Sequence, residues 1–83
     1  MTVDYDPRVL AQLDHHGIRP ASSTGPAVVR EHLNDLYRHE IRTLRRRVRA
    51  EEFPRAEYAD RVRALRKRYW LLSVPVVNWT RNA

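Results

Sequence analysis

The sequence contains no cysteine, so it can form neither disulfide bonds nor thiolate metal sites. It also has no run of 18 apolar residues, and we therefore expect no membrane-spanning helix. The first residues lack the charged and apolar regions of an export signal, so a cytoplasmic location is the expectation. Lysine is nearly absent as well, because among the 16 basic residues only Lys67 is not arginine.

The charge of the chain is strongly positive. The chain has 83 residues and a formal net charge of +6. Such a charge favours nucleic acid or an acidic protein surface as a partner. Acidic residues are interleaved with the arginines, which is typical of a solvated, salt-bridged surface. One arginine-rich side of a predicted helix is nevertheless a candidate for anion contacts: Arg38, Arg42, Arg45, Arg46 and Arg49. If nucleic acid binds there, we expect binding through backbone charge with little sequence preference.

The clearest periodic pattern predicts a helix over residues 54–73. Its apolar residues recur at spacings of three and four, which places them on one helical face: Tyr58, Val62, Leu65, Tyr69 and Leu72. Pro54 suits the first turn of a helix, where its missing N–H costs nothing. Pro75 is expected to end the segment by pushing Val74 towards extended geometry.

A second, longer pattern predicts a helix over residues 27–52. Its apolar stripe again steps by three and four: Val29, Leu33, Leu36 or Tyr37, Ile41, Leu44 and Val48. Thr24 or Gly25 is expected to cap this helix, with Pro26 in its first turn. Several arginines near its end match the negative end of the helix dipole.

The predicted fold is all-α, in a single small domain. Two amphipathic helices joined by a short turn favour an antiparallel two-helix hairpin over one long helix kinked at Pro54. A short helix is expected over residues 4–17, with Asp6 as N-cap and Gly17 as its stop, and a linker over 18–26. Residues 74–83 are expected to form an extended C-terminal arm.

The C-terminal arm and the end of the second helix carry much apolar surface for so small a chain. Either the arm folds back over the hairpin, or it anchors the chain in a groove of another subunit, and the second interpretation is favoured slightly. The candidate partner-binding residues are Tyr37, Tyr69, Trp70, Leu71, Val74, Val76, Val77 and Trp79. Tryptophan and tyrosine lead the set because they are the side chains most often found as interface anchors.

No catalytic motif or cofactor site is recognisable. His32, Asp35 and His39 share one side of the first long helix and could reach a metal ion, but such spacing on a solvent face often arises by chance. We therefore predict no metal, no cofactor and no catalytic residue. A small helical enzyme formed at a dimer interface, with arginines clamping an anion and Glu40 or His39 as acid or base, stays an alternative.

The leading functional hypothesis is a non-catalytic interaction protein. Two helices can cover only one side of each other, so the hairpin needs its own arms, a second copy or a larger protein subunit to bury its stripes. The sequence therefore predicts a small accessory subunit that docks through its helix stripes and its C-terminal arm. A nucleic-acid-binding module is the main alternative. Truncation after Ser73 is expected to abolish partner capture while leaving much of the helicity.

Overall fold

The computed structural model describes residues 2–81 and is all-α. Three α-helices form the body, α1 (Pro7–His15), α2 (Pro26–Arg49) and α3 (Tyr58–Arg68). Three short 3₁₀ helices complete it, η1 (Arg55–Glu57), η2 (Trp70–Ser73) and η3 (Val76–Asn78). Among residues 2–81 there is no strand, and a single antiparallel bridge joins Tyr5 to Thr80.

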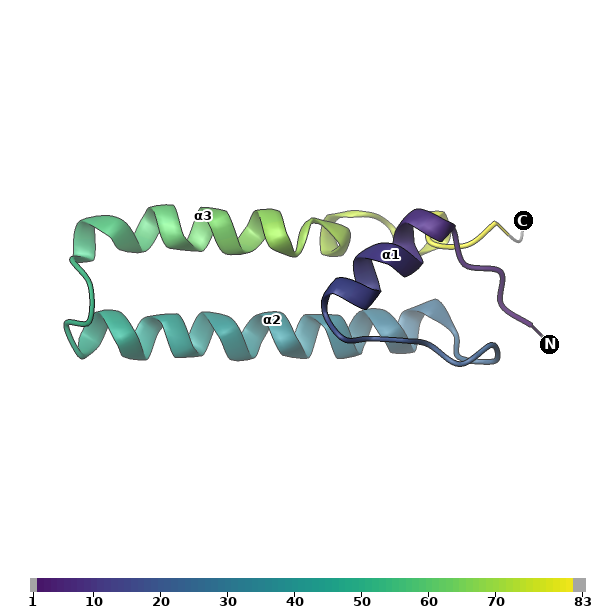
Figure 1. Cartoon of the computed structure of the whole chain (residues 1–83), viewed down its shortest axis with the longest axis horizontal. Helices are drawn as coiled ribbons and strands as arrows, with labels where there is room; N and C mark the ends of the chain where they lie inside the picture. The colour runs from purple at the N-terminus through teal and green to yellow at the C-terminus, as the bar shows by residue number, and fades with distance from the viewer. Residues whose placement is uncertain (1, 82–83) are drawn as a thin grey trace.

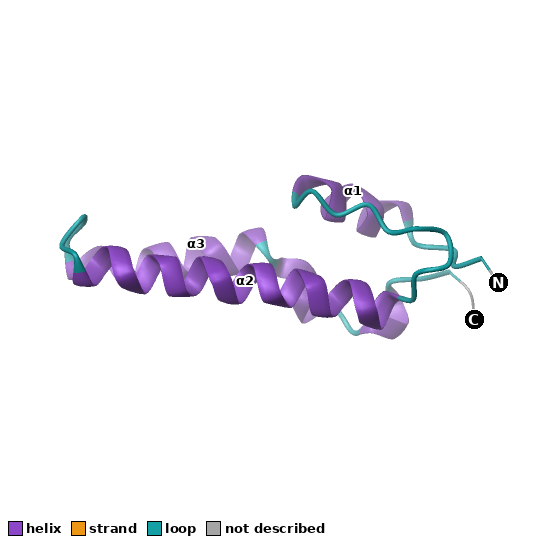
Figure 2. Ribbon diagram, turned by 90° about the horizontal axis from the view of Figure 1, so that it is seen from below, coloured by secondary structure: helices purple, strands orange, loops and turns teal. Residues whose placement is uncertain are grey.

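Helices α2 and α3 run antiparallel as a long hairpin, and α1 lies across one face of it at the end where both termini are found (Figure 1). The molecule measures 49 × 17 × 16 Å, with a radius of gyration of 15.2 Å. A compact domain of this length has a radius of gyration of about 12 Å. The protein is therefore a rod with a third helix at one end, as the second view also shows (Figure 2).

The two ends of α1 follow the local chemistry that the sequence indicates. The Asp6 side chain accepts a hydrogen bond from the Arg8 backbone N–H at 2.8 Å, which caps the helix. Hydrogen bonds from Arg8 also lower the pKa of Asp6. Gly17 has a φ of +75° and ends the helix in the left-handed region that glycine enters at little cost. The helix is shorter than the predicted 4–17, since Asp4 and Tyr5 precede its first residue.

Helix α2 begins at the predicted cap, since Gly25 is its N-cap and Pro26 its first residue. It ends at Arg49, three residues before the predicted boundary at 52. Beyond Ala50, Glu51 takes a φ of 59°, and the Glu52 N–H donates to the Arg47 carbonyl oxygen at 3.0 Å. This arrangement is a Schellman motif, which reverses the chain and directs Phe53 towards the helix pair.

The second helix is shorter than the predicted 54–73. Pro54 has an extended ψ of 142° and precedes the 3₁₀ turn η1, so the α-helix starts only at Tyr58. At the other end Tyr69 leaves helical geometry, with ψ 31°, and η2 follows. The tighter winding of a 3₁₀ helix rotates the following side chains. As a result Leu71, which the helical stripe would omit, is fully buried.

The C-terminal arm is not extended, which corrects the prediction for 74–83. Val74 and Pro75 keep extended backbone angles, but η3 then turns the chain back across the hairpin before Thr80 forms the bridge with Tyr5. The Asp6 N–H donates to the Trp79 carbonyl oxygen at 2.9 Å, and the Arg81 N–H donates to the Asp4 carbonyl oxygen at 2.8 Å. These bonds join the arm to the N-terminal segment. Residues 82 and 83 of the predicted arm lie outside the described residues.

The core lies at the end of the rod where all the segments meet. Its buried members come from α1, the linker, both long helices and the C-terminal arm: Tyr5, Val9, Leu13, Ile18, Val29, Leu33, Leu65, Tyr69, Leu71 and Trp79. Nearer the tip of the hairpin, only Leu44 and Phe53 among the apolar side chains of residues 2–81 are also buried, outside this cluster. The Arg61 guanidinium covers the Phe53 ring at 4.0 Å. Half of the hairpin therefore has two helices and no third layer.

Candidate functional site

Three of the predicted partner-binding residues lie inside the chain's own core. Trp79 and Leu71 are 0 % exposed and Tyr69 is 5 % exposed. The Trp79 indole N–H also donates to the Val74 carbonyl oxygen at 3.1 Å. The arm therefore folds back over the hairpin, which corrects the favoured expectation of an arm reaching for another subunit. The physical reason is the bend at η3, which carries Trp79 onto apolar surface that this chain itself provides.

Trp70 has a different environment and lines an open hollow on the surface. It is 44 % exposed, although it sits one residue from the buried Tyr69 and Leu71. We call this depression the Trp70 hollow; its volume is about 470 Å³. It is lined by Tyr37, Arg66, Lys67, Tyr69, Trp70, Leu72 and Ser73. Three of the predicted anchors, Tyr37, Tyr69 and Trp70, thus meet at one place, with basic side chains on the margin.

The remaining predicted anchors lie outside the Trp70 hollow. Val74 and Val76 are half-buried against the body, whereas Val77 is 78 % exposed. The structure therefore leaves Val77 as an isolated exposed side chain, and single exposed apolar residues are ordinary on protein surfaces.

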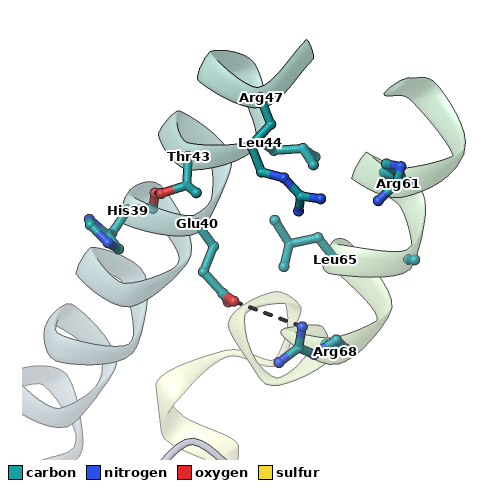
Figure 3. Close-up of a pocket in the computed structure, with 9 residues that line it drawn as sticks. His39, Glu40, Thr43, Leu44, Arg47, Arg61, Leu65 and Arg68 are labelled. Atoms are coloured by element: carbon teal, nitrogen blue, oxygen red, sulfur yellow. Dashed lines mark hydrogen bonds and ion pairs between the residues drawn. The ribbon is translucent and has the colours of Figure 1, made fainter. Parts of the chain in front are cut away.

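A second depression lies between α2 and α3, beyond the end of α1. Figure 3 shows it from the side of Glu40, Arg47 and Arg68. This distal groove has a volume of about 470 Å³ and is lined by His39, Glu40, Thr43, Leu44, Arg47, Arg61, Ala64, Leu65 and Arg68. Its apolar floor is formed by Leu44 and Leu65, which are 8 % and 7 % exposed. Sequence reasoning treated these two leucines only as stripe residues, because a groove requires the relative placement of two helices.

The charged side chains of the distal groove are mostly basic. The Glu40 carboxylate reaches from α2 towards α3, where its Oε1 lies 3.8 Å from the Arg68 guanidinium (Figure 3). The other carboxylate oxygen, Oε2, is buried. Burial raises the pKa of Tyr69 well above its usual range, and a side-chain hydrogen bond with Glu40 and the negative charge of that carboxylate add to the shift. Three guanidiniums and one carboxylate therefore line this groove.

Helix α1 ends at the same place. The Gln12 amide donates to the Arg68 carbonyl oxygen at 3.2 Å, and the His16 Nε2 lies 3.0 Å from that oxygen. The His16 ring also packs on Tyr69, with ring centroids 4.3 Å apart. These contacts satisfy a carbonyl at the C-terminal end of α3, where intrahelical donors run out. They fix the position of α1 next to the distal groove.

The predicted anion-contact residues divide into two groups. Arg38 pairs with Asp35 at 3.9 Å, and the Arg42 side chain donates to the Arg38 carbonyl oxygen at 3.4 Å. The others have no ion pair within residues 2–81: Arg45, Arg46 and Arg49. Arg55 joins Arg45 and Arg49 around a shallow depression of about 320 Å³ at the tip of the hairpin. Arg45, Arg49 and Arg55 thus meet at the tip without an ion pair among the described residues, while Glu51 and Glu52 border the neighbouring depression beside Arg49 and Arg55.

Candidate metal ligands do not gather in the part of the chain that the structure describes. Over residues 2–81 no group of three His, Asp or Glu side chains is placed to hold a metal ion. His32 and Asp35 border a shallow depression near the start of α2, whereas His39 lies at the outer edge of the distal groove. No helix within residues 2–81 has the length and apolar character needed to cross a membrane.

Compared with known proteins, the chain matches no family model, and neither a curated protein nor a solved structure gives a significant match.

Proposed function

We propose that this chain is a non-catalytic helical interaction protein, a small subunit or accessory factor that binds a larger protein through the Trp70 hollow. The observation that carries the proposal is the exposure of Trp70 within an apolar depression bordered by Tyr37 and Leu72. The chain buries its other tryptophan completely, so apolar burial within the monomer is available and Trp70 does not use it. Tryptophan and tyrosine in a hollow with a polar rim match the composition of interface hot spots.

The margin of the hollow favours a partner of a particular charge. Arg66 and Lys67 line it, and no ion pair involves either side chain among the described residues. An acidic rim on the partner would complement them, which accelerates encounter and selects against basic surfaces. A second copy of this chain carries the same charge of +6, so a different protein is the partner proposed.

Replacing Trp70 by alanine tests the proposal. We expect the variant to lose about thirtyfold in affinity for its partner, equivalent to the roughly 2 kcal/mol that defines an interface hot spot. The measurement is affinity purification of the tagged protein from its native cell, followed by titration of the captured protein against each variant. Circular dichroism checks that the helices persist.

The matched control is Leu10→Ala. Leu10 is 40 % exposed, close to the exposure of Trp70, but it lies on α1 and does not line the hollow. Its substitution should leave capture unchanged. Equal capture by the Trp70 variant and the parent protein would contradict the proposal, as would a wild-type chain that remains a monomer and captures nothing. Mass determination of the complex separates a larger partner from a second copy.

A second candidate function is binding of nucleic acid through the arginines at the tip of the hairpin. The observation that favours it is the absence of ion pairs, within residues 2–81, at Arg45, Arg49 and Arg55, which border one depression. Phosphate oxygens would neutralise such a group without reading base sequence.

Salt dependence tests this second candidate. If three phosphates are neutralised, the logarithm of the binding constant for a random-sequence duplex should fall with the logarithm of salt concentration at a slope of about −3. Arg49→Ala should make the slope shallower by about one unit. Arg8→Ala is the control, because Arg8 pairs with Asp6 on α1. Absence of binding at low ionic strength would dispose of this candidate.

A further inference from the structure

The distal groove continues the groove that α1 already occupies. Helix α1 packs Val9 and Leu13 against α2 and α3, and its last turn ends at Arg68 and Tyr69. Arg68 also lines the distal groove, where it faces Glu40. Figure 1 shows α2 and α3 continuing well past the end of α1 with no third helix beside them. The chain itself therefore demonstrates that an amphipathic helix fits this pair of helices.

The side chains along the distal groove leave room for another helix. At about 100° per residue, Glu40, Thr43 and Arg47 project from one side of Leu44. On α3 the corresponding wall contains Ala64, an exposed residue with a small side chain. Small side chains at a contact allow two helices to approach closely. Leu44 and Leu65 are already 8 % and 7 % exposed, so a second helix would cover the small apolar surface that the groove floor still exposes.

The charges of the groove define the chemistry of the occupant. The guanidiniums of Arg47, Arg61 and Arg68 line it, against the single carboxylate of Glu40. Arg47 and Arg61 pair with Glu52 and Glu57 at 3.7 and 3.3 Å, and because all four side chains are at least 40 % exposed, these pairs contribute little to stability. The Arg68 pair with Glu40 is longer, at 3.8 Å, and its carboxylate is half-buried. A helix with carboxylates beside its apolar stripe complements this margin. A second copy of this chain would instead bring its own positive charge against it.

We infer that the distal groove binds an acidic amphipathic helix of another protein, which completes a three-helix bundle beyond α1. The inference rests on the proposed function in that the chain works by binding protein, but it concerns a different surface from the Trp70 hollow. It predicts that the partner contributes an apolar stripe at helical spacing, flanked by glutamates or aspartates.

A library of displayed helical peptides tests this inference on the full-length protein. The peptides carry leucine, isoleucine, methionine or phenylalanine at one helical stripe, and glutamate, lysine, glutamine or serine at random elsewhere. We expect the enriched peptides to be strongly acidic. Enrichment of neutral or basic peptides, or of none at all, would overturn the inference.

Ala64→Glu locates the binding site, because it places bulk and negative charge in the groove at an exposed helical position. Ala59→Glu is the matched control: it makes the same change on the same helix, at an exposed residue that does not line the groove. The enriched peptides should lose at least about tenfold in affinity for the first variant, or 1.4 kcal/mol, and less than about twofold for the second. Circular dichroism confirms that both variants keep their helices.

The outcomes separate this inference from the proposed function. Equal loss at Ala59→Glu and Ala64→Glu would reveal nonspecific attraction and overturn the inference. Loss of peptide binding in the Trp70→Ala variant alone would place the peptides in the Trp70 hollow and also overturn it. A dimer of the chain that Ala64→Glu dissociates would make a second copy the occupant, which is a third contradiction. None of these results affects capture of the larger partner through Trp70.

Discussion

Replacing Trp79 by alanine is expected to lower the free energy of unfolding by roughly 3–5 kcal/mol, the range for removing a large buried aromatic side chain. Trp79 is 0 % exposed and is the largest fully buried side chain of the described chain. Its removal leaves a cavity where α1, both long helices and the C-terminal arm meet. It also takes away the donor to the Val74 carbonyl oxygen. For a chain of this size the total stability is roughly 4–12 kcal/mol, so the loss is a large part of it.

The Trp70→Ala variant is the matched control for Trp79→Ala. Trp70→Ala removes the same side chain from a half-exposed position, and we expect it to cost at most about 1 kcal/mol, as for other surface substitutions. Urea unfolding followed by far-ultraviolet circular dichroism measures both variants at one protein concentration. Similar midpoints for the two tryptophan variants would contradict the buried position of Trp79.

The position of Trp79 also changes the expectation for truncation after Ser73. Sequence reasoning expects the shortened chain to keep much of its helicity while losing its partner. The structure places Trp79 beneath α1 and joins the arm to the N-terminal segment through the Asp6 and Arg81 backbone hydrogen bonds. Removing the arm therefore removes part of the core, and loss of partner capture in such a truncation would follow from unfolding. Single substitutions at Trp70 are the cleaner test of binding.

Leu13→Ala is expected to produce the second large effect on stability, a loss of roughly 2–5 kcal/mol. Leu13 is 0 % exposed and packs from α1 into the main core, together with Val9. Because α1 is only nine residues long, it has little helical stability of its own and depends on this contact. The substitution should therefore detach α1 from the hairpin.

Leu10→Ala on the same helix is the control for Leu13→Ala. Leu10 is 40 % exposed, and its substitution should cost at most about 1 kcal/mol. Amide hydrogen exchange distinguishes local detachment from global unfolding, because α1 should lose protection while α2 retains it. Equal effects of the two leucine substitutions would contradict the packing of α1 on the hairpin.

The elements of the fold were largely predictable because their signals are local. The stripes of Val29, Leu33 and Leu44 on one helix, and of Leu65 and Tyr69 on the other, are recognisable by spacing, and the structure buries all five. The caps at Asp6, Gly17 and Gly25 also depend only on neighbouring residues. Boundaries were less predictable, since the 3₁₀ turns on either side of α3 depend on contacts with α2. One such contact is the hydrogen bond from Arg30 to the Leu72 carbonyl oxygen, at 2.9 Å.

The candidate surfaces were predictable only in part. The sequence singled out Trp70 and Tyr37 as candidate anchors because they are large aromatic side chains, and both line the Trp70 hollow, while their binding of a partner stays a prediction. The distal groove was not recognisable, because no pattern along one helix reports how far another helix lies from it or where α1 stops. The arginines at the tip that lack an ion pair within residues 2–81 were not distinguishable from the paired ones. Pairing depends on side chains that approach across the hairpin turn, such as Glu52 with Arg47.

By itself, the sequence determined that the chain is helical, where two long amphipathic segments lie, and that apolar residues crowd its C-terminal end. Those properties follow from spacing, capping and composition, which act over a few residues. Only the tertiary structure decided that Trp79 enters the core while Trp70 stays on the surface. The physical reason is that burial depends on the whole set of surfaces that can meet, and η3 brings Trp79, not Trp70, onto the apolar surface shared by α1 and the hairpin.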